Sequence, residues 1–426
     1  MPTPSTAPRW RARLERLGDR LGRQPHLGAV RDGVVAALPL VLIGSTFLLV
    51  AQPPSRLLHE LAAPHAATLL LPYRMLGGLI SLYVCFGTAR SLARRHGLDE
   101  LGVALMAVAS FLVAVGPVEV QGGGWGLAAE RLGAGGLFGA LAVALASVEI
   151  QRAIAARNLT IRLPETAPEA IGRSFASIVP GFASVVGCWL LVHVAGFDLV
   201  AVLESAVRPL VGVSDSLPGV LALCLVDSAM WLIGLHPMAL LAPLKPIWLA
   251  MLAENMEVAA SGGLPPHVAT REFFLWFVWQ GGSGGTLAAA LLLLRARSGT
   301  LKAVGRLGFV PALFNVNEPI LFGIPVVMNP RVAVPFLAAP LATATTTWIA
   351  MSAGWVARPR LDVLWTLPAP AGAFLSTGGD GAALVLQLAN LALAGLIWWP
   401  FLRVWDRELL AKEGPPDPAA APALAG

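Results

Sequence analysis

The chain has 426 residues, of which 56% are hydrophobic and 13% are charged, with a formal net charge of +5. Soluble domains carry roughly 25% charged residues. The composition therefore excludes a disordered protein, a nucleic-acid-binding protein and almost any soluble enzyme of this length. With a mean hydropathy of +0.71, the apolar residues are expected to face lipid.

Cysteine usage excludes two further classes. Cys85, Cys188 and Cys224 lie in or near apolar runs. They are too few for a disulfide scaffold, and the CxxC spacing of zinc sites is absent. We therefore expect no bound metal and no cofactor.

The first 27 residues form a basic segment. Trp10, Leu14, Leu17 and Leu21 recur at helical spacing, and the first 31 residues contain seven arginines. This pattern predicts an amphipathic helix on an anionic inner leaflet, although a solvated helix with a small apolar stripe fits as well. Basic residues favour the cytoplasmic side, so we predict a cytoplasmic N-terminus.

Long apolar runs predict an all-α integral membrane protein with about ten transmembrane helices. Charge-free runs of suitable length cover residues 33–55, 101–118, 132–148, 174–197, 273–294, 332–357 and 381–402. Residues 69–88 and 217–235 are similar, with one charge each. The basic residues predict loops 119–131 and 198–215 outside the cell.

The segment 231–253 is apolar but interrupted. His236, Pro237, Pro243, Lys245 and Pro246 break what would otherwise be one helix. Broken backbone at membrane depth is tolerated only inside protein or beside a water-filled cavity. His236 is thus a candidate ligand-binding residue, and a packed histidine bonded to a carbonyl is the alternative.

The segment 311–330 carries the strongest polar signal. Asn315, Asn317 and Glu318 lie between apolar flanks, and Pro319 and Gly323 follow. We predict a re-entrant hairpin whose tip presents two amides and a carboxylate, which match sugar hydroxyls. The alternative is a structural Glu318 paired with an arginine or with Lys245.

Three weaker features accompany these segments. Gly281–Gly285 (GGSGG) suits close helix packing or a smooth substrate passage. Trp365 could stack on a sugar ring or anchor the chain at the membrane interface. Residues 345–347, all threonine, suggest a polar contact between helices.

At these motifs the chain resembles the IIC permease subunits of the bacterial phosphoenolpyruvate-dependent phosphotransferase system, in the lactose/cellobiose/diacetylchitobiose group. The matching stretches are HLGAVRDGVVAALPLVLIGS (26–45), RSFASIVPG (173–181), PIWLAMLAEN (246–255), FNVNEPILFGIPVVMNP (314–330), LSTGGD (375–380) and LIWWPFLRVWDREL (396–409). The resemblance as a whole extends over about residues 13–413, and NEPILFGIP is its most specific stretch.

The resemblance implies ten transmembrane helices, two re-entrant hairpins and a homodimer in the bacterial inner membrane. It implies a scaffold and dimerisation half (28–215), a substrate-transport half (216–410) and a disordered tail (411–426). A disaccharide would be carried inward and phosphorylated on its C6 hydroxyl by a phosphocysteine of a separate IIB protein. Glu318 would hold that hydroxyl with His236 beside the sugar; Asn315, Asn317 and Trp365 would complete the site.

The chain departs from the family at one site position. Pro237 follows the motif histidine, where the family usually has glycine, so substrate preference at that wall is open. No IIB phosphocysteine loop is visible, and phosphoryl transfer would require a partner chain.

Two other functions are considered. One is a sugar transporter or facilitator that works without phosphorylation. The other is an intramembrane enzyme that uses His236 and Glu318 as an acid–base pair, but no orienting residue or nucleophile motif supports it.

Overall fold

The computed structural model describes residues 24–53, 56–120, 122–161, 164 and 168–413. The predicted amphipathic helix at the N-terminus lies outside the described residues, and so does nearly all of the predicted disordered tail. The first described helix, α2, begins at Pro25. Gln24 caps its N-terminus, because the Gln24 side chain accepts a hydrogen bond from the Leu27 amide.

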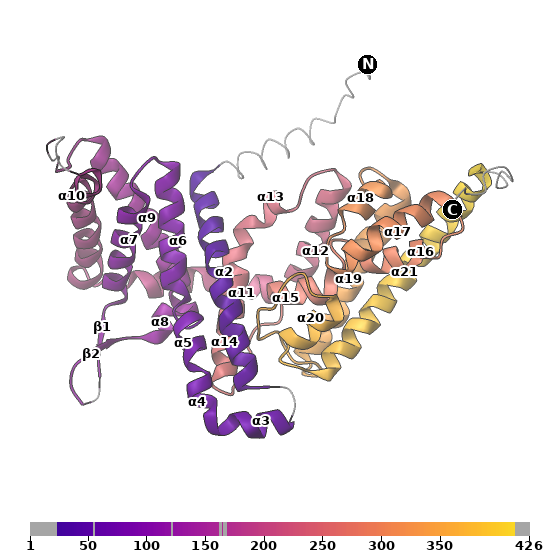
Figure 1. Ribbon diagram of the computed structural model, residues 1–426, viewed down its shortest axis with the longest axis horizontal. Coiled ribbons are helices and arrows are strands. Elements are labelled where there is room, and N and C mark those ends of the chain that lie inside the picture. Colours follow the sequence, from indigo (N-terminus) through magenta and orange to yellow (C-terminus); the bar gives the residue numbers. More distant parts are fainter. Residues whose placement is uncertain (1–23, 54–55, 121, 162–163, 165–167, 414–426) are drawn as a thin grey trace, which may run out of the picture.

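The N-terminal half is a bundle of mostly continuous helices (Figure 1). It contains α2 (Pro25–Ala51), α3 (Arg56–Ala62), η1 (Ala63–His65), α4 (Ala66–Leu69), α5 (Leu71–Leu76), α6 (Ile80–Arg95), α7 (Glu100–Val115), α8 (Ala129–Leu132), η2 (Ala134–Gly136), α9 (Leu137–Ala156), α10 (Glu169–Trp189) and the π-helical turn η3 (Leu190–Val194). A short antiparallel hairpin, β1 (Pro117–Glu119) and β2 (Trp125–Leu127), lies in the predicted outer loop 119–131 and just before it.

Helix α6 is the centre of this bundle, with α2, α7 and α9 around it. A Cβ at Gly33 of α2 would overlap the Thr88 hydroxyl of α6, so the two backbones approach closely there. Small residues permit such contacts between helices in lipid, where packing replaces the hydrophobic effect.

Residues 198–215 form a helix, so the prediction of a loop there is wrong. Helix α11 (Leu199–Asp215) is capped by Asp198, whose side chain accepts from the Ala201 amide. Its charged residues are spaced along an amphipathic helix, and we had interpreted them as a loop signal. Helix α12 (Leu217–Leu232) follows at a bend of 75°.

The C-terminal half contains many short and broken helices beside two long ones, α19 and α21 (Figure 1). They are α13 (Met238–Leu241), η4 (Ala242–Leu244), α14 (Lys245–Ala260), α15 (Arg271–Phe273), the π-helical turn η5 (Phe274–Val278), α16 (Thr286–Leu294), α17 (Gly299–Leu313), α18 (Glu318–Gly323), α19 (Pro330–Ser352), α20 (Ala369–Ser376) and α21 (Gly381–Glu413).

The predicted uninterrupted span 273–294 is wrong. The helix stops at Val278 and resumes at Thr286. Gly281, Gly282, Gly284 and Gly285 between them all have positive φ, a conformation open to glycine and incompatible with a continuing right-handed helix. The glycine run therefore breaks the helix rather than allowing close packing along it.

The structure confirms an all-α membrane fold. Among the described residues, six helical segments are long and apolar enough to cross a bilayer, or seven if the bent pair α11–α12 counts as one. They are Pro25–Ala51, Leu71–Arg95, Ala134–Ala156, Phe175–Val194, Pro330–Ser352 and Gly381–Glu413. Any further crossings would fall on shorter or broken helices, so the count of ten stays a prediction.

The threonine run makes the helix–helix contact expected of it. Thr346 of α19 donates to the Asn390 side-chain oxygen of α21 over 2.7 Å, and the Asn390 amide donates to the Thr347 hydroxyl over 2.7 Å. Asn390 and Thr347 are buried. Hydrogen bonds of this kind join helices in the membrane because no water competes for them.

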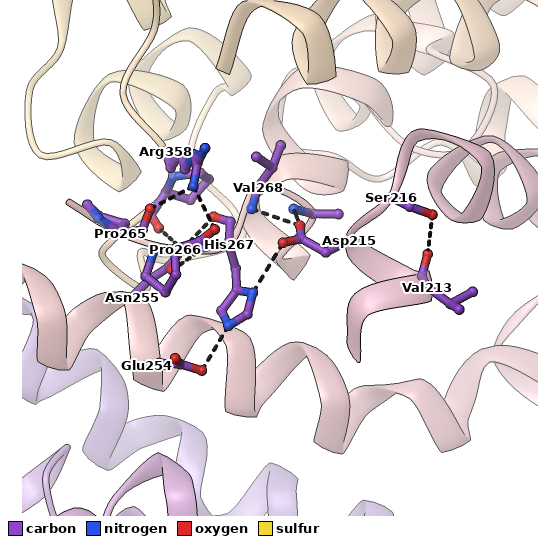
Figure 2. A network of polar contacts seen from close by, with 12 residues as sticks. Val213, Asp215, Ser216, Glu254, Asn255, Pro265, Pro266, His267, Val268 and Arg358 are labelled. Atoms are coloured by element: carbon purple, nitrogen blue, oxygen red, sulfur yellow. Dashed lines mark hydrogen bonds and ion pairs between the residues drawn. The ribbon is translucent and has the colours of Figure 1, made fainter. Parts of the chain in front are cut away.

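A second polar network joins α14 to the bend between α11 and α12 (Figure 2). His267 contacts Asp215 through Nδ1 (3.1 Å) and Glu254 through Nε2 (2.8 Å). Asp215 also accepts from the Val268 and Ala269 amides. Burial lowers the pKa of His267, but its bonds to the two carboxylates outweigh that effect and raise its pKa to about 9. The protonated histidine thus ties the chain together where the two halves meet.

Candidate functional site

The candidate site is built around the predicted hairpin tip. Helix α17 ends at Leu313 and α18 begins at Glu318, which confirms a helix break in this segment. Asn315 lies in the left-handed region with φ of +63°, which asparagine tolerates better than most residues. Pro319 occupies the first turn of α18, where its missing N–H costs nothing.

Asn315 connects the tip to two other segments. Its side-chain amide donates to the Trp365 carbonyl (2.8 Å) and the Leu367 carbonyl (3.0 Å). Its side-chain oxygen accepts from the Gly281 amide (3.2 Å). Both amide hydrogens and the oxygen are thus engaged, and the tip is fixed against the loop that carries Trp365.

Asn317 fixes the tip to the glycine break. Its side chain is buried and donates to the Ser283 carbonyl over 3.0 Å. A Cβ at Gly282 would overlap the Asn317 amide, and Gly282 has φ of +109°. Only glycine fits that position. In this structure the glycine run Gly281–Gly285, for which a smooth substrate passage was one alternative, is therefore the surface against which the hairpin tip packs.

Glu318 lies exposed at the start of α18. Among the described residues, no basic side chain lies at ion-pair distance from it, so the alternative of a structural ion pair with an arginine or Lys245 gains no support. A carboxylate placed this way can accept hydrogen bonds from a hydroxylated ligand.

His236 is exposed and lies beside an aromatic ring. Its imidazole contacts the Trp231 ring edge-on, with centroids 5.0 Å apart and planes at 61°. His236 lies in the break between α12 and α13, whereas the hairpin tip lies between α17 and α18. The structure therefore brings together Asn315, Asn317, Glu318 and Trp365, while His236 lies on a separate break.

A cavity of about 280 Å³ adjoins Trp365. Its walls include Trp248, Trp279, Lys245 and, from the N-terminal half, Val35. Aromatic faces combined with a few polar groups are typical of pockets for small hydroxylated ligands. Because Asn315 bonds the Trp365 carbonyl, the hairpin tip and this cavity share one wall.

The sequence analysis missed a charged cluster at the same cavity. Arg271 bonds Glu272 (Nε to Oε1, 2.9 Å) and Asp362 (Nη2 to Oδ1, 2.5 Å), and both carboxylates are buried. The predicted span begins at Phe273 and leaves Arg271 and Glu272 just outside it. Their position next to an apolar run was a usable signal, but the pairing with Asp362 was not readable from one sequence.

One group of side chains among the described residues has the spacing of metal ligands. His26, His96 and Glu149 converge within the N-terminal half, with each histidine Nε2 at 2.9 Å from Glu149 Oε1. Arg152 binds the other carboxylate oxygen. The four side chains satisfy one another as a hydrogen-bond network that joins α2, α6 and α9.

The chain is similar to known proteins over most of its length. Residues 31–340 match the family "Phosphotransferase system, EIIC". The chain is 35% identical to the cellobiose-specific EIIC component of Geobacillus stearothermophilus, over 94% of each chain. It is 30% identical to the lactose-specific EIICB component of Lacticaseibacillus casei, over 94% of this chain and 71% of that protein.

The fold matches a solved structure as well. The transporter ChbC, the IIC component from the N,N'-diacetylchitobiose-specific phosphotransferase system, superposes with a TM-score of 0.85 at 32% identity. The match covers 94% of this chain and 98% of that one. A match of this extent includes both halves of the molecule and the broken helices of the C-terminal half.

Proposed function

This chain belongs to the EIIC family of the phosphotransferase system, and on that premise we propose that it binds a disaccharide of the cellobiose, chitobiose or lactose type. It is a membrane-spanning sugar permease that works with a IIB domain. The sugar class is supported by the relatives' names, which specify cellobiose, lactose and N,N'-diacetylchitobiose.

One observation carries the proposal: the hairpin tip and the aromatic cavity are joined through Asn315 and Trp365. Glu318 is exposed at this tip. We assign Glu318 to the C6 hydroxyl, Trp365 to the sugar ring, and His236 to a flanking contact. Asn315 and Asn317 hold the hairpin tip in place through their side-chain hydrogen bonds. This positioning is their contribution to the site.

The chemical step takes place on the partner. The S–P bond of a IIB phosphocysteine breaks, a P–O bond forms at the C6 oxygen of the sugar, and the released cysteine thiolate takes up the hydroxyl proton. Glu318 accepts a hydrogen bond from the hydroxyl and so orients it. The resulting dianion cannot readily recross the membrane, where a charged group is costly, so the sugar is trapped.

Translocation follows from the division of the chain. We assign residues 28–215 to a dimeric scaffold and residues 216–410 to a transport half that moves against it in alternating access. We assign the N-terminus to the cytoplasm, because the basic residues Arg90, Arg94 and Arg95 lie in the C-terminal part of α6, and Arg95 forms an ion pair with Asp32 near the start of α2.

A binding panel tests the sugar class. Purified protein is titrated with cellobiose, N,N'-diacetylchitobiose and lactose, with sucrose and maltose as controls, by calorimetry and thermal shift. At least one of the first three should bind and raise the melting temperature. If none binds, or the controls bind equally well, the proposed sugar class is wrong.

A further inference from the structure

A second cavity lies at the far end of the C-terminal half, away from the sugar site. Its volume is about 380 Å³, and it lies between the end of α16 and the last turns of α21. Four arginines line it, against a single carboxylate from Asp406. The arginines are Arg295, Arg297, Arg403 and Arg407.

The carboxylate is already occupied. Asp406 accepts from the backbone amides of Arg297 (2.9 and 3.1 Å) and Ser298 (2.8 Å). Within the described part of the chain, the Arg295, Arg403 and Arg407 side chains have no ion-pair partner. The cavity therefore has an unbalanced positive charge that favours an anion.

The outer face of α21 places this charge at the edge of an apolar surface. Leu396, Trp399, Arg403 and Arg407 follow one another at helical spacing. Leu396 is 69% exposed and Trp399 is 49% exposed. With a rise of about 1.5 Å per residue, the two arginines lie about 10–16 Å beyond Leu396 along the axis.

Trp399 marks the depth of this surface in the bilayer. Tryptophan prefers the boundary between hydrocarbon and headgroups. The Arg403 guanidinium lies 5.0 Å from the Trp399 ring centroid, a cation–π contact that leaves its N–H groups available. Helix α21 thus passes from an apolar face, through an interfacial indole, to a basic cavity.

We propose that this cavity binds the headgroup of an anionic phospholipid, with the acyl chains against the exposed apolar face of α21. Basic pockets between transmembrane helices bind such headgroups because their basic side chains lie at the depth of the headgroups and carry the opposite charge. The exposed Leu396 and Trp399 beside the cavity favour a lipid over a soluble protein. Acyl chains pack against apolar side chains, whereas an acidic protein surface would bind the arginines without them. The proposal rests on the membrane fold and is independent of the sugar class.

Delipidated protein tests the proposal. Phosphatidylglycerol and phosphatidylcholine are titrated separately, with retention measured by native mass spectrometry and thermal shift. The Arg403→Gln/Arg407→Gln variant should bind phosphatidylglycerol about 30-fold more weakly, from about one kcal/mol per basic residue. The matched control, Lys302→Gln/Arg306→Gln on α17, removes the same charge outside the cavity and should bind like the wild type.

Several outcomes would overturn the proposal. They are equal binding of both lipids by the wild type, equal phosphatidylglycerol binding by the two double variants, and a full thermal shift from glycerol phosphate alone. A Gln double variant that keeps the lipid but loses IIB-dependent sugar phosphorylation would assign the cavity to a protein partner. Should that variant misfold, loss of the wild type's lipid preference at high salt supports the proposal, and an unchanged preference refutes it.

Discussion

The two halves of the molecule treat helix breaks differently. In the N-terminal half, α2, α6 and α9 run without interruption, and their polar residues form ion pairs at the helix ends, as between Asp32 and Arg95. In the C-terminal half, breaks at Gly281–Gly285 and Asn315–Asn317 are joined by side-chain amides. Continuous helices suit a scaffold. Paired helix breaks instead bring solvent-accessible polar groups together at one point among the helices.

The largest expected effect comes from adding one methyl group at a break. Gly282→Ala forces a left-handed conformation on alanine and overlaps the Asn317 amide. We expect a loss of about 2–5 kcal/mol of stability, from backbone strain and overpacking together. Thermal unfolding of the purified protein measures it, and sugar binding should fall in parallel.

The matched control lies in the scaffold half. Gly187 in α10 has open space where a Cβ would be placed, so Gly187→Ala should change stability by no more than about 1 kcal/mol. Equal losses from the two substitutions would show that the breaks are no more constrained than an ordinary helix position.

Removing the charge at the tip should mainly affect binding. Glu318→Gln keeps the size of the side chain but replaces a charged hydrogen-bond acceptor, which contributes about 1.5–3 kcal/mol. Affinity for the bound disaccharide should fall roughly 10- to 150-fold, with the fold and oligomeric state retained. Calorimetry gives the affinity.

Glu408 provides the comparison for this change. Glu408 lies on α21 and forms an exposed ion pair with Arg331 of α19, and Glu408→Gln should leave sugar affinity unchanged. Comparable losses in both variants would point to a general charge effect and away from the hairpin tip.

The helix break that carries His236 should contribute less to sugar affinity than the hairpin tip. His236→Ala removes a neutral hydrogen-bonding group, and Pro237 already fixes the turn beside it. We expect affinity to fall about 2- to 10-fold. A loss as large as that of Glu318→Gln would place His236 at the centre of the site.

The last comparison concerns the pH dependence of stability. Because the folded pKa of His267, about 9, lies above its ordinary value of 6.5, its stabilisation is complete below about pH 6.5 and is lost as the pH rises through 9. The contribution is at most about 3 kcal/mol. The melting temperature of the wild type should fall between pH 7 and 10, and His267→Gln should flatten that decline. Parallel pH curves for the two proteins would contradict the assignment.

Two of the features of the C-terminal half could be predicted from the sequence, the hairpin tip and the threonine contact. The re-entrant tip was predicted because Asn315, Asn317 and Glu318 interrupt an apolar run near prolines, and local chemistry alone determines such a break. The threonine contact was predicted for the same reason, since polar side chains in lipid need partners.

The remaining features depend on long-range pairing. The break at Gly281–Gly285 was ambiguous, because glycines allow both close packing and an interrupted helix, and its partner Asn317 lies more than thirty residues away. The Arg271–Asp362 pair spans about ninety residues. No periodicity in a single chain indicates which distant segment supplies such a partner.

Transport by proteoliposomes tests the central claim most directly. Vesicles containing the protein and enclosing a phosphorylated IIB protein are supplied with labelled disaccharide, and the internal product is identified by mass spectrometry. We predict that sugar 6-phosphate accumulates inside, that it depends on the phosphorylated partner, and that Glu318→Gln greatly reduces it. Accumulation of unmodified sugar, independent of the partner, would contradict group translocation and favour a simple transporter on the same fold.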